Sequence, residues 1–247
     1  MIPMHFLLAD GIFLLSGFLQ GLIGFGAAMI AMPLLALIMN TKTAVAACNL
    51  CCIGMNILMC YTLRGQVDRR KILPLIVGSI PGVAVGTATL QMVDEQMITL
   101  MLGGLVVAYA LYSLLIKPVV LRISPNWGFL AGLLTGYVGS VTSAGGPPSA
   151  VYTSLMGWEK DELKGTLSAF FLFAGVTVAA GHFICGLTTP EVLGLSGEAL
   201  PFILLGAYWG NLYANRVNEA SYRKAVLVIL VLMGLALVHN GMRSALS

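Results

Sequence analysis

The sequence predicts an all-α membrane protein made of two inverted repeats, each with a broken, re-entrant helical hairpin followed by three transmembrane helices. Three observations lead to this prediction: the composition, two glycine-centred breaks inside apolar stretches, and an internal repeat. Hydrophobic residues make up 58% of 247 positions, charged residues only 9%, and the mean hydropathy is +0.93. A soluble domain of this size needs far more charge on its surface.

The apolar positions fall into eight segments that are separated by short loops. A helix needs ~20 apolar residues to cross the hydrocarbon core of a bilayer. The segments span residues 5–39, 43–63, 71–91, 96–116, 127–157, 163–185, 199–215 and 222–243. We therefore expect a multi-pass protein of the plasma (inner) membrane, with the lipid bilayer as a partner and no attached soluble domain.

Two of these segments are interrupted by glycine. The first break is Gly24-Phe25-Gly26, which runs on to Pro33, and the second extends from Thr142 to Pro148. Backbone that leaves a helix at membrane depth is tolerated only where it is buried in protein or lines a water-filled cavity. Two such breaks in corresponding halves indicate a transport site.

An internal repeat divides the chain into residues 1–120 and 121–247. The stretch 17–22 returns as 128–133, and the proline-led helix that starts at Leu73 is echoed from Leu200. Glycines recur at about every fourth position in these helices, and we interpret them as close packing contacts between helices, with direct solute contact as the alternative. The glycines concerned are Gly78, Gly82, Gly206 and Gly210.

The basic residues decide the topology. If all eight segments cross, the 13 basic residues divide seven against six, which contradicts the usual cytoplasmic excess of Lys and Arg. If segment 127–157 returns to the side it entered, the division is eleven against two, with only Lys42 and Arg243 outside. The count is neutral for segment 5–39, where the repeat and the absence of basic residues before Lys42 favour a hairpin. Both termini are then expected on the outer face.

At each break a short helix starts afresh inside the membrane, and its free backbone amides and positive dipole end form an anion site without formal charge. Gly145 and Gly146 allow close approach, and Pro147 suits a first helical position. Nearby hydroxyl and amide side chains can add donors or can bond their own helix backbone. The residues expected to bind the anion are Gln20, Gly24, Gly26, Ala27, Asn49, Thr142, Ser143, Gly145, Gly146, Pro147, Ser149 and Ser168.

Ionisable groups are scarce inside the apolar segments. Asp10 and Glu198 are interpreted as interfacial, at an outer end and at a helix start. His182 lies deeper, and we expect a hydrogen-bonded packing residue, with proton relay as the alternative. The C-x-x-C spacing from Cys48 to Cys51 lies inside an apolar helix, so packing is favoured over a metal or redox site.

Other classes of function lack their sequence signatures. A nucleic-acid binder would need a basic stripe, and none exists. No H-E-x-x-H, no G-x-S-x-G and no acidic pair on a membrane helix is present, so we expect neither an enzyme nor a bound cofactor or metal.

The two breaks and their flanks resemble motifs of the TauE/SafE family of membrane anion exporters, often called the sulfite exporter family. The stretch G-L-I-G-F-G-A-A-M-I-A-M-P from Gly21 to Pro33 is similar to the first motif, and G-G-P-P-S-A-V-Y from Gly145 to Tyr152 to the second. Family members often have a third glycine after Gly26, where this chain has alanines. The resemblance implies export of sulfite or small organosulfonates.

The sequence therefore predicts a secondary transporter of small anions that works by alternating access, with the anion held at two half-helix N-termini. It does not choose between a uniporter and a proton-coupled carrier. Two alternatives stay open: an anion channel on the same scaffold, and a non-transporting membrane scaffold subunit.

Overall fold

The computed structural model describes residues 4–23, 26–116, 120–121, 123–213 and 219–246. This part of the chain is helical and contains no strand. The helices are α1 (Met4–Ile23), α2 (Ala27–Ile38), α3 (Thr41–Thr62), α4 (Arg69–Met92), α5 (Glu95–Leu115), α6 (Trp127–Thr142), α7 (Gly146–Met156), α8 (Lys160–Ile184), α9 (Pro190–Tyr213) and α10 (Glu219–Leu246), with the short 3-10 helix η1 (Arg64–Gln66) between α3 and α4.

Within the described residues, six helices are long and apolar enough to cross a membrane. They are α3, α4, α5, α8, α9 and α10, and their apolar parts contain 20 to 24 residues. At a rise of about 1.5 Å per residue, this corresponds to about 30–36 Å, the thickness of the hydrocarbon core. The chain is thus a multi-pass membrane protein, as the composition predicts.

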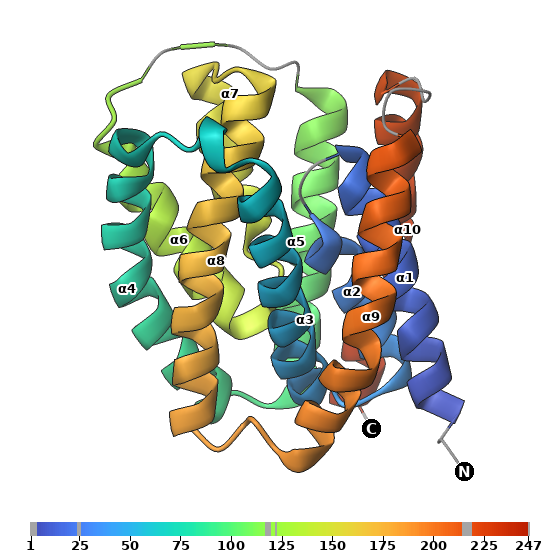
Figure 1. Ribbon diagram of the computed structural model, residues 1–247. Helices are drawn as coiled ribbons and strands as arrows, with labels where there is room; N and C mark the ends of the chain where they lie inside the picture. The colour runs from blue at the N-terminus through green and yellow to red at the C-terminus, as the bar shows by residue number, and fades with distance from the viewer. Residues whose placement is uncertain (1–3, 24–25, 117–119, 122, 214–218, 247) are drawn as a thin grey trace.

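The remaining four helices form two hairpins. In Figure 1, α1–α2 enters the bundle from the end where both termini lie, and α6–α7 enters from the opposite end. Both hairpins turn back inside the molecule. Helix α6 has 16 residues and α7 has 11, about 24 Å and 16 Å, so neither crosses alone. The hairpin in segment 5–39, for which the charge count was neutral, is also present.

Each hairpin packs on a helix from the other half of the chain, α1 on α9 and α6 on α4, through rows of glycine. A Cβ atom on Gly210 would overlap the carbonyl of Phe18, and one on Gly82 would overlap the carbonyl of Leu133. Close approach of backbones is how helices associate in lipid, and the predicted packing role of these glycines is confirmed. The glycines of these contacts are Gly17, Gly21, Gly206 and Gly210, and Gly78, Gly82, Gly86, Gly132 and Gly136.

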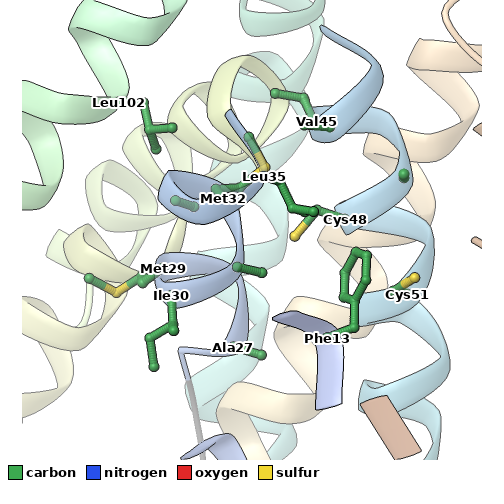
Figure 2. Close-up of a cluster of buried hydrophobic side chains, with 14 of the residues drawn as sticks. Phe13, Ala27, Met29, Ile30, Met32, Leu35, Val45, Cys48, Cys51 and Leu102 are labelled. Atoms are coloured by element: carbon green, nitrogen blue, oxygen red, sulfur yellow. The ribbon is translucent and has the colours of Figure 1, made fainter. Parts of the chain in front are cut away.

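The largest cluster of buried apolar side chains surrounds α2. Ala27, Met32 and Leu35 on this helix are at most 1% exposed. Figure 2 shows Phe13 of α1 beside Cys48 and Cys51 of α3 in this cluster. Both cysteines are fully buried there, so they serve as packing residues. The re-entrant helix α2 is therefore held rigidly, although it is only 12 residues long.

Polar caps mark the two ends of the bundle. Near the termini, the Asn40 side chain accepts hydrogen bonds from the first amides of α3 and donates to Glu95 of α5. At the opposite end, Asp68 caps α4, and Lys71 forms an ion pair with Glu162 of α8. By sequence, eleven of the 13 basic residues lie in or beside the segments at this second end. The orientation derived from this distribution, with both termini outside, stays a prediction.

One expected boundary is wrong. Helix α9 begins at Pro190, whereas the hydropathy pattern placed its start at 199. Proline is favoured in the first turn of a helix because its missing amide needs no partner there. Glu198, expected at a helix start, consequently lies inside α9, with an exposed side chain.

Candidate functional site

A cavity of about 80 Å³ lies where the turns of the two hairpins meet α3 and α8. Roughly 10–15 Å³ suffices for one water molecule, so the cavity holds several waters or one small polyatomic solute. The lining residues are Gln20, Gly26, Ala27, Ala28, Met29, Asn49, Cys52, Ile53, Asn56, Thr135, Gly136, Gly139, Ser143, Gly145, Gly146, Phe171, Ala174, Gly175 and Val178.

The tip of the first hairpin is capped by a glutamine. Gln20 Oε1 accepts a hydrogen bond of 2.7 Å from the amide of Ala27, and the Met29 amide donates to the Gly26 carbonyl at 3.0 Å. The amides of Ala27 and Met29 are therefore not free, in contrast to the free amides expected where this short helix starts. Because the Gln20 oxygen is occupied, its Nε2 group is left as a donor at the cavity. Gly26 has φ +99°, a conformation that favours glycine.

The tip of the second hairpin leaves two backbone amides open. Ser143 ends α6 in the left-handed region, at φ 57°, and its amide donates to the Gly139 carbonyl at 2.8 Å. The Ala144 amide donates to Thr142 Oγ1. The amides of Gly145 and Gly146 have no acceptor among the described residues. The next two residues are prolines, which have no amide proton.

The two hairpin tips face each other across the cavity. A Cβ atom on Gly146 would lie 3.5 Å from Met29 Sδ of α2, and Figure 2 shows the Met29 side chain extending away from α3 towards the α6–α7 hairpin. A Cβ atom on Gly145 would lie 2.6 Å from the Thr135 carbonyl oxygen. Gly145 is therefore required by backbone packing, whereas Gly146 leaves open space in the cavity.

None of the described lining residues carries a charge. The positive ends of α2 and α7 point into the cavity, and each is equivalent to roughly half an elementary charge. A bound anion would be stabilised by these dipoles and by the free amides. Such a site can hold an anion and still release it, since no fixed positive side chain pairs with it.

The side walls carry polar groups from α3 and α6. Asn49 Nδ2 donates to the Gly175 carbonyl at 3.0 Å. Asn56 and Thr135 are 6% and 3% exposed, and Asn56 Oδ1 and Thr135 Oγ1 have no hydrogen-bond partner within the described residues. Neither residue was among those predicted from the sequence to bind the anion. Asn56 was recognisable from its spacing, because it follows Asn49 by two helical turns and shares its face.

The structure brings together seven of the twelve residues expected at the site: Gln20, Gly26, Ala27, Asn49, Ser143, Gly145 and Gly146. Gly24 lies outside the described residues. The other four, Thr142, Pro147, Ser149 and Ser168, do not line the cavity. Ser149 Oγ donates to the Gly146 carbonyl, and Thr142 Oγ1 donates to the Val138 carbonyl. These two hydroxyls therefore bond the backbone of their own helices, which was the alternative to anion binding. Pro147 faces an apolar groove between α5, α6 and α7, and Ser168 is buried in α8.

Asp10 and His182, two ionisable residues inside the bundle, do not line the cavity. His182 is 1% exposed, and its Nε2 lies 3.0 Å from the Ser140 carbonyl oxygen, so it is a hydrogen-bonded packing residue, as expected. Asp10 is 8% exposed, and its Oδ1 has no partner among the described residues. It lies in the second turn of α1, near the end of the bundle where the termini lie, and its interfacial position stays a prediction.

The comparison with known families agrees with this arrangement. The family described as Sulfite exporter TauE/SafE matches residues 11–237, which include the turns of both hairpins and all residues that line the cavity. The chain belongs to the TauE/SafE family. Searches among curated proteins and among solved structures gave no match. As a TauE/SafE member with six apolar spanning helices, the chain belongs among membrane transport proteins.

Proposed function

We propose that this TauE/SafE protein is a secondary transporter that exports small anions such as sulfite or organosulfonates. One observation carries the proposal: a cavity between two half-helix N-termini in which, among the described residues, the Gly145 and Gly146 amides lack acceptors and no lining residue is charged. Backbone amides at a helix N-terminus are suited to oxyanions. The family match favours sulfur oxyanions among them.

The size and charge of the cavity favour a small monovalent anion. A volume of about 80 Å³ suits a small solute better than a nucleotide or a long-chain acid. Without a Lys or Arg partner, burial of a second negative charge would be strongly disfavoured. Export of one negative charge from a negative-inside cell is downhill by about 2.3 kcal/mol at 100 mV, so a uniporter needs no coupling ion.

We further propose that the two halves are inverted repeats that alternate access to the cavity. The packing of each hairpin on a helix of the other half supports this proposal. Helix α1 packs on α9, and α6 packs on α4, both through rows of glycine. A hairpin and its partner helix can then move as one unit, and the cavity lies between the two units. The opposite entry of the hairpins in Figure 1 also supports it.

The test is transport by the purified chain in liposomes. Vesicles loaded with unlabelled sulfite are diluted into labelled sulfite, and the expected result is saturable accumulation that depends on internal sulfite, in contrast to protein-free vesicles. Unitary currents far above carrier turnover would identify a channel instead. Absence of sulfite and sulfonate flux, together with absence of ligand-induced thermal stabilisation, would favour a scaffold subunit.

A further inference from the structure

Two residues that line the anion cavity carry a polar atom without a partner. Asn56 Oδ1 on α3 and Thr135 Oγ1 on α6 are buried and have no hydrogen-bond partner in the part of the chain that the structure describes. Threonines in membrane helices commonly donate to the carbonyl four residues earlier, as Thr142 and Thr177 do here. Thr135 does not. Leaving such groups unpaired is unfavourable, so each is expected to have a partner when the cavity is occupied.

The chemistry of Asn56 restricts that partner. A carboxamide oxygen only accepts hydrogen bonds, so an oxyanion oxygen cannot satisfy it. The neighbouring Asn49 uses its Nδ2 group on the Gly175 carbonyl, and its own oxygen has no donor among the described residues. The α3 wall therefore presents acceptor oxygens besides the Asn56 Nδ2 donor, whereas the second hairpin tip and Gln20 Nε2 present donors.

We propose that the solute carries its own O–H or N–H group besides its anionic group, and that Asn56, assisted by Thr135, recognises this group. The inference rests on the proposed function. The anionic end would lie against the amides of Gly145 and Gly146, and the O–H or N–H would donate to Asn56 Oδ1. The solute class is thus a small monoanion with a hydrogen-bond donor, and Asn56 is the residue that determines specificity.

Discrimination by such a residue can be large. A site built to accept a hydrogen bond disfavours an analogue without the donor, because the buried acceptor then stays unpaired. Two sulfonates that differ by one hydroxyl make a matched pair of probes: 2-hydroxyethanesulfonate and ethanesulfonate. We expect the purified full-length protein to bind the hydroxylated compound about tenfold more tightly or better.

The variants Asn56→Leu and Asn211→Leu separate recognition of the solute's O–H or N–H group from the general effect of replacing an asparagine in a membrane helix by leucine. Asn211 is exposed on α9 and does not line the cavity, so Asn211→Leu should keep the wild-type preference. Asn56→Leu should lose the preference while ethanesulfonate affinity stays within about threefold. If Asn56→Leu does not fold, Thr135→Val, which keeps the side-chain shape, should reduce the preference in the same titration.

The outcomes distinguish this inference from the proposed function. Equal affinity of the wild-type protein for both sulfonates would overturn the inference and leave anion binding intact. Equal loss of both affinities in Asn56→Leu would mean that Asn56 donates to the anionic group, and would also overturn it. If sulfite and both sulfonates fail to bind the wild-type protein, the proposed function fails, and the inference with it.

Discussion

Two adjacent glycines at the second hairpin tip, Gly145 and Gly146, should respond differently to substitution by alanine: one change should affect anion binding and the other should affect stability. A Cβ atom on Gly146 would meet only the flexible Met29 side chain, at 3.5 Å, and would project into the cavity. A Cβ atom on Gly145 would lie 2.6 Å from the Thr135 carbonyl oxygen and 2.8 Å from Gly139 Cα, both of them backbone atoms. Gly146→Ala should therefore impair binding, and Gly145→Ala should impair folding.

The magnitudes follow from these contacts. Gly146→Ala reduces the entropy of the unfolded chain, which stabilises by about 0.4–1 kcal/mol, but its methyl group crowds the following proline. The two effects oppose each other, so Tm should stay within about 3 °C. Displacement of an anion from one amide removes a charge-assisted hydrogen bond of about 1.5–3 kcal/mol, which weakens binding by about 10- to 100-fold. Overpacking by Gly145→Ala costs about 1–3 kcal/mol.

The assay combines thermal unfolding of the detergent-solubilised protein with its stabilisation by sulfite. Gly146→Ala should unfold near the wild-type temperature but require 10- to 100-fold more sulfite for the same shift, by the estimate above. Gly145→Ala should unfold about 2–12 °C lower without sulfite. A Gly146→Ala protein that is folded and binds sulfite with wild-type affinity would refute the proposed position of the anion.

Three further predictions use other parts of the structure. Gly82→Ala, which overlaps the Leu133 carbonyl, should lower Tm by about 2–12 °C; Gly104→Ala, with open space around it, is the control and should change little. Ser143→Gly should raise Tm by a few degrees, because φ 57° disfavours side chains by roughly 1–2 kcal/mol; a lower Tm would contradict this. The third prediction uses a variant that lacks the other half-exposed cysteines, Cys60 and Cys185. Its cavity-lining Cys52 thiol should react with a small thiol reagent more slowly when sulfite is present. An unchanged rate of labelling would contradict occupancy of the cavity by sulfite.

Local sequence signals predicted the hairpins because their causes are local. A Gly-x-Gly or Gly-Gly-Pro-Pro stretch inside an apolar run ends one helix and starts another wherever it is placed. The first tip has fewer free amide donors than these signals predicted, because the Ala27 amide donates to Gln20 Oε1. It also placed the start of α9 too late, since Glu191 and Glu198 lower the hydropathy there without breaking the helix.

Which polar side chains reach the cavity could not be predicted in the same way. Thr142 and Ser149 flank the second break in sequence, yet their hydroxyls donate to carbonyls of their own helices. Asn56 and Thr135 are seven or more residues from either break and line the cavity. The difference depends on which face of α3 and α6 meets the hairpin tips, and this is set by packing between helices from different parts of the chain.

The sequence by itself determined the membrane class and the two interrupted helices, because hydropathy and backbone freedom act within a few turns of helix. Only the tertiary structure decided which tips meet, which amides are already capped and which polar groups lack partners. Those properties depend on contacts such as α1 with α9 and α6 with α4, between residues more than 50 positions apart, and no local preference encodes them.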